Sequence, residues 1–357
     1  MDHFTVSALK YRPKRFDQVI GQEIITSTLI NSIKSNQLAQ ALLFCGPRGV
    51  GKTSCARILA REINDNDNNP SNDDYSYNIF ELDAASNNGV EEIKRLNEQV
   101  RVPPRIGNFK VYIIDEAHML STSAFNAFLK TLEEPPKHAI FILATTEKNK
   151  IIPTILSRCQ IYDFKLISTE KIKEYLKIIC NKKDIEYEED ALIIIAKNAG
   201  GAMRDALSIL DKIISFTEGK ITRDKVSKNL NILDTETYFL ITSLINENNI
   251  AQILIEFDKL VNKGYDTKYF LDGFANHIRE LILCKDPKSV NLIELNNETK
   301  KSYLIQSKIF EINWLIEALN IIKIAEINHK ASVNKRLNSE LCLMQLASLQ
   351  INGEKKN

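Results

Sequence analysis

The sequence lacks the features that would place the chain in a membrane or in a secretion pathway. No apolar run approaches the ~18 residues needed to span a bilayer, and residues 1–16 contain no apolar stretch typical of a secretory signal. The formal net charge is only +1, so any nucleic-acid contact must come from a local patch or from an assembly. We therefore expect a cytoplasmic protein that makes no membrane contact.

Paired cysteines are also missing. The six cysteines lie far apart, at positions 45, 55, 159, 180, 284 and 342, and none belongs to a C-x-x-C pair. A disulfide framework or a zinc site needs clustered cysteines. We expect most of these residues to be buried, reduced thiols.

The first part of the chain alternates between strand-like and helix-like segments. Buried strands are predicted by the apolar runs 41–45, 79–83, 110–114 and 139–144, and helices are predicted over 52–63, 89–101 and 121–133. This alternation predicts an α/β fold with a parallel sheet that has helices on both faces. The Asn- and Asp-rich segment 64–78 holds almost nothing that could build a core, so we expect a surface loop there.

Strand signals stop after about residue 166. Three helical stretches are predicted over 169–216, and residues 225–350 form long amphipathic segments rich in Ile and Leu. A chain of 357 residues has room for two or three domains. We predict a nucleotide-binding α/β domain over 1–166, a helical lid over 167–222 and an all-helical domain over 223–357.

The sharpest motif lies at residues 46–53, which match the phosphate-binding pattern G-x-x-x-x-G-K-[ST]. Its backbone N–H groups and the start of the following helix favour phosphate. Lys52 would contact the β- and γ-phosphates, and the Thr53 hydroxyl would bind Mg²⁺. The candidate ATP-binding residues of this loop are Gly46, Pro47, Arg48, Gly49, Val50, Gly51, Lys52, Thr53 and Ser54.

A second motif, residues 111–118, is an apolar strand that ends in two carboxylates. Asp115 would hold Mg²⁺, directly or through water, and Glu116 would orient and deprotonate the attacking water. The alternative is that both residues only cap the next helix.

Three further positions suit a motor that senses its nucleotide. Thr145 and Thr146 follow a strand, where a hydroxyl can read the γ-phosphate or the attacking water; a simple strand-end cap is the alternative. Arg204 stands in the first turn of a predicted helix, where the helix dipole disfavours a cation, so it suggests either an anionic partner or a surface salt bridge. Arg158 lies on a loop beyond the sheet, where it could act as an arginine finger in a neighbouring subunit.

The order of these motifs resembles the gamma/tau subunit family of bacterial DNA polymerase III. The likeness is dense over residues 7–220 and rests on the segments GPRGVGKT, YIIDEAHML, LKTLEEPP, LATTEKNKIIPTILSRC and GGAMRDALSILD. The resemblance implies an AAA+ ATPase within a five-subunit clamp loader, which uses ATP to load the sliding clamp onto primed DNA at the replication fork. The 223–357 domain would then be the collar that joins the subunits.

The resemblance also implies roles for single residues. Thr146, or Thr145, looks like sensor 1, Arg204 like sensor 2, and Arg158 like the arginine finger acting in trans. The residues that would frame the adenine are Tyr11, Arg12, Pro13, Val19, Ile20 and Gly21. The expected partners are further gamma copies, delta, delta-prime, the sliding clamp and primer-template DNA, which would be gripped through its backbone by candidates such as Lys94, Arg95 and Lys130; each of these three could equally lie on a solvated helix face.

The chain departs from the family in two places. Most relatives carry four zinc-binding cysteines between the P-loop helix and the next strand, whereas 64–78 has neither Cys nor His, so we predict no zinc. The chain also stops near the collar, and we expect it to lack the segments by which the longer tau form binds helicase and polymerase.

The sequence argues against three other functions. The letters DEAH at 115–118 also occur in superfamily 2 helicases, but such enzymes need a second strand-rich core, and none is predicted here. A non-catalytic scaffold subunit would not need Lys52, Asp115, Glu116 and Arg204 intact. No segment resembles a polymerase carboxylate site, so a polymerase activity would come only from the holoenzyme.

Overall fold

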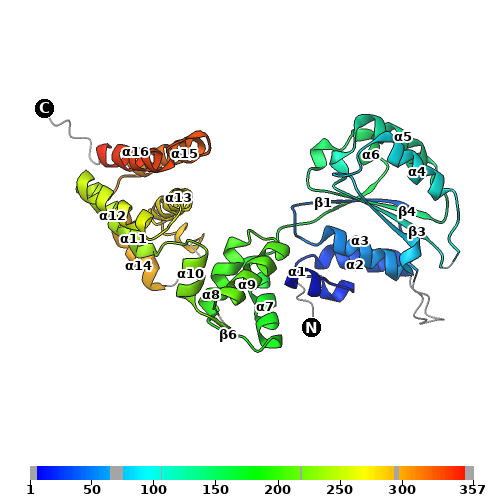
Figure 1. Cartoon of the computed structure of the whole chain (residues 1–357), viewed down its shortest axis with the longest axis horizontal. Helices are drawn as coiled ribbons and strands as arrows, with labels where there is room; N and C mark the ends of the chain where they lie inside the picture. The colour runs from blue at the N-terminus through cyan, green and yellow to red at the C-terminus, as the bar shows by residue number, and fades with distance from the viewer. Residues whose placement is uncertain (1–5, 65–74, 106, 218, 293–296, 350–357) are drawn as a thin grey trace. The chain divides into compact units, whose positions relative to one another are not determined.

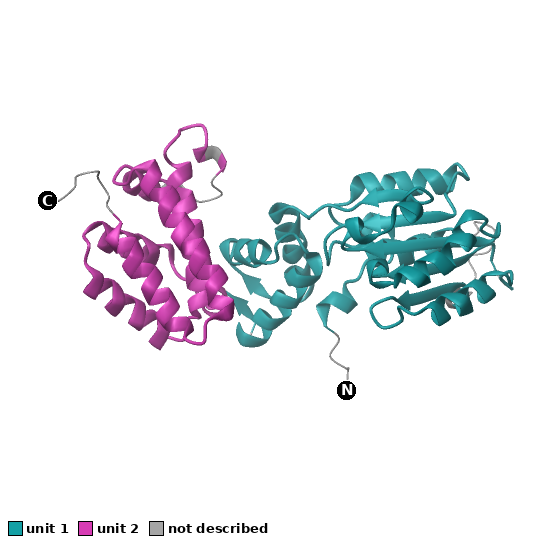
Figure 2. Ribbon diagram, turned by 90° about the horizontal axis from the view of Figure 1, so that it is seen from above, with its two compact units in different colours: residues 1–223 teal, residues 224–357 magenta. Residues whose placement is uncertain are grey.

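The computed structural model describes residues 6–64, 75–105, 107–217, 219–292 and 297–349. The chain forms two compact units, residues 1–223 and 224–357 (Figure 2). Among the described residues, no helix is long and apolar enough to cross a membrane. The further division of the first unit at residue 166 stays a prediction.

The first unit is built around a five-stranded parallel sheet with the strand order β2-β3-β4-β1-β5. The strands are β1 (Ala41–Cys45), β2 (Ile79–Asp83), β3 (Lys110–Asp115), β4 (Ala139–Thr145) and β5 (Gln160–Asp163). Four of them lie where strands were predicted, and the parallel sheet is confirmed. The expectation that 79–83 is a buried strand was wrong, because β2 is an edge strand whose residues are only partly buried or exposed. β5 was not predicted, because it is a short edge strand in which only Ile161 and Tyr162 are apolar.

Helices cover both faces of this sheet (Figure 1). They are α2 (Glu23–Lys34), α3 (Lys52–Glu62), α4 (Val90–Val100), α5 (Thr122–Glu133) and α6 (Pro153–Leu156). This part of the chain also contains the short helix α1 (Ser7–Lys10), which packs against a later helix, and the 3-10 turns η1 (Phe16–Gln18), η2 (Tyr75–Asn78), η3 (Ala117–Met119) and η4 (Lys148–Lys150). One core packs Leu42 and Phe44 against α2 and α3, and the other packs Leu43 against α4, α5 and α6. Successive residues of β1 thus enter opposite cores, as a strand buried on both faces requires.

Three longer helices follow the sheet, as predicted. They are α7 (Thr169–Lys182), α8 (Glu189–Asn198) and α9 (Met203–Thr217). The expectation that strands end near residue 166 was wrong, because β6 (Glu186–Tyr187) and β7 (Lys220–Ile221) pair in parallel beside these helices. Each has only two residues, too few for a periodic pattern in the sequence.

The described part of the second unit consists of helices and contains no strand, as predicted for this half of the chain. The helices are α10 (Arg223–Asn229), which begins at the boundary, α11 (Thr235–Asn246), α12 (Ile250–Asn262), α13 (Thr267–Leu283), α14 (Asn297–Ser307), α15 (Ile312–Ala331) and α16 (Lys335–Ser348), with a 3-10 turn η5 (Val290–Leu292). They share one apolar core that includes Phe274, Leu315 and Leu343. The second strand-rich core of a superfamily 2 helicase is therefore absent from the described residues.

The loop and the absence of zinc were both predicted from residues 64–78, most of which lie outside the described residues. Asn64, the first residue of this segment, does not lie in a solvated loop as expected. Asn64 is fully buried, and its side-chain oxygen accepts hydrogen bonds from the backbone N–H groups of Asn108 and Phe109 at 3.1 and 2.9 Å. A polar side chain can be buried when its hydrogen bonds are satisfied in this way.

The cysteines are free, and all except Cys159 are buried, which confirms the expectation for most of them. Burial raises the pKa of Cys55 and Cys342 to about 12. Both therefore remain neutral thiols at physiological pH.

Candidate nucleotide-binding site

The glycine-rich loop joins the end of β1 to the start of α3, which is the predicted strand–loop–helix context. Gly46 has φ 146°, and a Cβ there would lie 2.4 Å from the carbonyl oxygen of Phe164. Only glycine fits this position. α3 starts at Lys52 with no side-chain cap on its first backbone N–H groups, so these donors face the loop and are free to bind an anion.

Lys52 is 5% exposed, and its ammonium lies inside the loop. Nζ donates to the backbone oxygens of Gly46 at 2.7 Å and of Pro47 at 2.8 Å. Burial lowers the pKa of Lys52, while the nearby carboxylates of Glu116 and Asp115 oppose that shift. A buried cation held by carbonyl oxygens is well placed to receive a phosphate.

The Thr53 hydroxyl donates to Oδ2 of Asp115 at 2.8 Å. Thr53 lies in the first turn of α3 and Asp115 lies at the end of β3, so a helix and a strand of the sheet meet here. Mg²⁺ typically takes one or two protein oxygens and fills its shell with phosphate and water. The pair Thr53 and Asp115 therefore fits an Mg²⁺ that arrives with a nucleotide.

Glu116 adopts the left-handed conformation, with φ 48°. Such backbone is uncommon outside glycine, and it often marks a functional site. The Thr146 hydroxyl donates to Oε2 of Glu116 at 3.1 Å. The Thr145 hydroxyl instead lies 3.1 Å from Nδ1 of His118. Of the two candidate sensors, Thr146 is the one that contacts Glu116.

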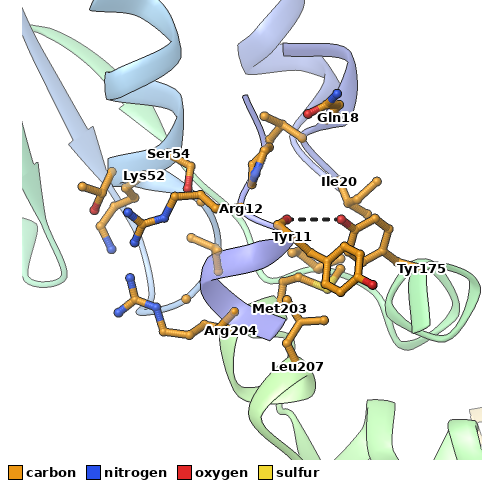
Figure 3. A pocket seen from close by; sticks show the side chains of 18 residues that line it. Tyr11, Arg12, Gln18, Ile20, Lys52, Ser54, Tyr175, Met203, Arg204 and Leu207 are labelled. Carbon is orange, nitrogen blue, oxygen red and sulfur yellow. Dashed lines mark hydrogen bonds between the residues drawn. The ribbon is translucent and has the colours of Figure 1, made fainter. Parts of the chain in front are cut away.

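A pocket opens beside the loop (Figure 3). It is lined by the expected residues Tyr11, Arg12, Pro13, Val19, Ile20, Gly49, Val50, Gly51, Lys52, Thr53, Ser54 and Arg204. It is also lined by residues that the sequence did not single out for a site, namely Ala8, Gln18, Ile167, Tyr175, Met203 and Leu207. Gly46, Pro47, Arg48 and Gly21 do not line it.

One end of the pocket is apolar and aromatic. Figure 3 places Tyr11 and Tyr175 close together, near Ile20, Met203 and Leu207. The Tyr175 hydroxyl donates to the backbone oxygen of Tyr11 at 3.3 Å. This end suits a flat heterocyclic base, since such sites combine apolar surface with a few polar groups.

The other end is cationic. Figure 3 shows the side chains of Arg12, Lys52 and Arg204 pointing toward the same space. Burial lowers the pKa of Arg12, and the positive charges of Arg57 and Arg204 lower it further. Arg12 was expected beside the adenine, but its guanidinium lies on the P-loop side of the pocket. Three cations that converge from separate elements favour a polyanionic ligand.

The N-terminal segment that carries Tyr11 and Arg12 is fixed to α9. The backbone N–H of Ser7 donates to Asp211 at 2.6 Å, and its hydroxyl binds the same carboxylate. Lys183 at the end of α7 donates to the Ser7 hydroxyl at 2.9 Å. A buried polar group bonded on several sides holds its segment in one position, so this side of the pocket is preorganised.

The start of α9 also contacts the P-loop directly. The Arg204 N–H lies 3.4 Å from the Gly49 oxygen. Gly49 has φ 76°, and a Cβ there would come within 3.0 Å of the Ala202 Cβ. The glycine thus allows the α9 segment to approach the loop, which places Arg204 at the cationic end of the pocket.

Two family models match consecutive parts of the chain. A model described as DNA polymerase III, delta subunit, matches residues 21–168. A model described as DNA polymerase III clamp loader subunit, ATPase lid domain, matches residues 171–219. Both concern the same replicative assembly.

Relatives that align over most of the chain show which subunit of DNA polymerase III it resembles. The DNA polymerase III subunit gamma of Buchnera aphidicola subsp. Baizongia pistaciae is 35% identical, with 87% of this chain and 86% of that protein covered. The gamma subunit of Buchnera aphidicola subsp. Acyrthosiphon pisum is 32% identical, with 99% and 94% covered. The chain belongs to the gamma/tau family of DNA polymerase III subunits.

Some gamma/tau relatives are longer than this chain. The Bacillus subtilis subunit tau is 37% identical over 94% of this chain, which spans 62% of the tau protein. Among solved structures, a variant of Thermotoga maritima RuvB has a TM-score of 0.51 at 22% identity, with 66% of this chain and 79% of RuvB covered. That likeness bears on the fold alone, and with the parallel sheet it supports the AAA+ P-loop architecture.

The gamma/tau motif that contains Arg158 lies away from the pocket. Arg158 follows α6, and its guanidinium bonds to the Glu133 carboxylate at 2.6 Å and to the Thr154 backbone oxygen at 2.9 Å. Arg158 is exposed and does not line the chain's own pocket. Its role as an arginine finger stays a prediction.

The candidate DNA contacts of this gamma/tau chain lie on two neighbouring helices, α4 and α5, which pack side by side on one face of the sheet (Figure 1). Lys94 and Arg95 pair with Glu91 and Glu92 one turn away, at 2.9 and 3.2 Å. Lys130 is exposed on α5. Exposed pairs of this kind contribute little to stability, so the cations are free to exchange partners, and DNA binding by them stays a prediction.

Proposed function

We propose that this chain is an ATP-dependent motor subunit of a bacterial clamp loader. It binds ATP with Mg²⁺ and hydrolyses it to open the sliding clamp and place it on primer-template DNA. The observation that carries this proposal is the convergence of buried Lys52, the bonded pair Thr53 and Asp115, and Glu116 beside one pocket. The family membership supplies the clamp-loading context.

Each residue of the site has a role that follows from its position. Lys52 and the N–H groups at the start of α3 hold the β- and γ-phosphates, and Thr53 and Asp115 hold Mg²⁺, which neutralises charge on the phosphates. Glu116, kept in place by Thr146, orients the attacking water and takes its proton. Arg204 reads the phosphates from α9, and the aromatic end around Tyr11 and Tyr175 receives the adenine.

The assembly completes the site. Arg158 of one subunit reaches the γ-phosphate of its neighbour and stabilises the charge that develops as the phosphoryl group transfers. The partners are further gamma copies, delta, delta-prime and the clamp, joined through helices of residues 223–357. The lid is residues 167–222. Work takes place in the cytoplasm at the replication fork.

Two substitutions test the proposed chemistry by separating binding from turnover. Lys52→Ala removes charge from the phosphates and should weaken ATP binding. Glu116→Gln should retain ATP binding and lose most turnover, because only water activation is removed. For both variants, nucleotide affinity is measured by titration with a fluorescent analogue, and turnover is measured by phosphate release. Normal turnover in Glu116→Gln contradicts the assigned base, and unchanged affinity in Lys52→Ala contradicts the assigned phosphate site.

A further inference from the structure

His118 occupies an unusual position beside Glu116. It lies on η3, two residues after Glu116, and its side chain is only 7% exposed. Nδ1 is 3.5 Å from Oε2 of Glu116, and Nε2 is 3.4 Å from Oε1 of Glu147. A largely buried ring therefore stands between two carboxylates, one of which is the proposed catalytic base.

The Thr145 hydroxyl also contacts the His118 ring, at the same nitrogen that faces Glu116. The Thr145 hydroxyl lies 3.1 Å from Nδ1 of His118 and accepts the backbone N–H of Glu147 at 3.0 Å. The ring is thus held by the end of β4 and by the residues that follow it. Glu116, by contrast, has a left-handed backbone, a conformation that persists only when surrounding groups hold it.

We propose that His118 is a positioning residue for Glu116: Glu147 and Thr145 orient the imidazole, and the imidazole holds the Glu116 carboxylate for water activation. This inference rests on the proposed ATPase function. A base that is itself oriented by a further side chain is a recurrent arrangement in enzymes. A misplacement of about 1 Å in a reacting group costs about a hundredfold in rate, so the loss of one support of Glu116 should appear in turnover.

The test uses three substitutions of His118, each measured in a reconstituted clamp-loader assembly, where a neighbouring subunit supplies Arg158. His118→Ala removes both ring nitrogens and should lower turnover about 10- to 100-fold, with ATP affinity changed by less than about twofold. The amide of His118→Asn lies near the position of Nδ1, so this variant should recover most of the turnover. The amide of His118→Gln reaches toward the position of Nε2 and should recover little. His138→Ala serves as the matched control. The His138 ring contacts the backbone oxygen of Val100 at 2.9 Å and not Glu116, so this variant should turn over ATP normally.

Several outcomes would overturn the inference. They are normal turnover in His118→Ala, a loss of ATP affinity as large as the loss of turnover, or recovery by Gln in place of Asn. Thermal unfolding of each variant shows whether it is folded, and the contrast between Asn and Gln still decides if the Ala variant unfolds. Glu116→Gln in the same assay separates the two proposals. Normal turnover in Glu116→Gln would contradict the proposed function. Normal turnover in His118→Ala, with turnover lost in Glu116→Gln, would contradict the positioning role alone.

Discussion

The Thr53 hydroxyl and the Asp115 carboxylate are joined by a 2.8 Å hydrogen bond between the first turn of α3 and the end of β3. The same two oxygen groups are those expected to bind Mg²⁺. Their contact shows that the two motifs, which lie 62 positions apart in the sequence, meet at one place in the fold. A cation that binds both groups would replace this hydrogen bond.

Replacing Thr53 tests the metal role at constant side-chain volume. Thr53→Val removes the hydroxyl but keeps the shape, so the bond to Asp115 and one Mg²⁺ ligand are lost. We expect turnover to fall at least about tenfold and to need more Mg²⁺, since loss of a group that holds or orients a metal lowers metal affinity about 10- to 100-fold. Thr53→Ser keeps the hydroxyl and is the control. Equal Mg²⁺ dependence of Val and Ser variants would contradict the role.

Arg12 distinguishes phosphate binding from base recognition. Its guanidinium points toward Lys52 and Arg204, so Arg12→Ala should weaken ATP and ADP alike, by about 10- to 100-fold, the size of a lost charged hydrogen bond. The ratio of ATP to GTP affinity should stay unchanged. Tyr175→Ala, at the opposite end, should change that ratio. If Arg12→Ala instead changes the ratio of ATP to GTP affinity, then Arg12 acts at the adenine and the assignment to the phosphates is contradicted.

DNA binding is expected to depend on charge and to be indifferent to sequence. Lys94→Glu, Arg95→Glu and Lys130→Glu combined should abolish the stimulation of the assembled ATPase by primed DNA. Affinity of the unchanged chain should fall steeply between about 50 and 200 mM salt, because phosphate contacts release counterions. Full DNA stimulation in the triple variant would show that these residues do not grip DNA. The charge-matched control reverses three exposed lysines of the first unit outside α4 and α5, Lys34, Lys182 and Lys212.

Much of the first unit could be predicted from the sequence because its signals are local. The predicted and observed bounds of β2 agree, residues 79–83, and the P-loop pattern lies within a single short segment, residues 46–53. Long-range features left no such signal. β6 and β7 form only by pairing with each other, and Asn64 is buried only because Asn108 and Phe109 supply its hydrogen bonds.

The candidate site shows the same division. Lys52, Asp115 and Glu116 stand in patterned motifs, so their residue types and spacing predicted their place. Tyr175 lies on α7, far from every motif, and it reaches the pocket only because the helical segment folds against the N-terminal segment. His118 was visible within a motif, but its contact with Glu147 depends on the neighbouring strand β4. Tertiary proximity of this kind cannot be read from one sequence.

The central claim is that one subunit hydrolyses ATP with help from its neighbour. The direct measurement is ATP turnover of clamp-loader assemblies reconstituted with delta, delta-prime, clamp and primed DNA, using Arg158→Ala chains, Lys52→Ala chains or a mixture of both. Such fingers contribute about 10³–10⁵ in rate in other P-loop systems. We predict that each variant alone gives little turnover, and that the mixture exceeds the sum of the two because a Lys52→Ala chain supplies Arg158 to its neighbour. A mixture that never exceeds that sum, or loss of ATP binding by isolated Arg158→Ala, would contradict the account.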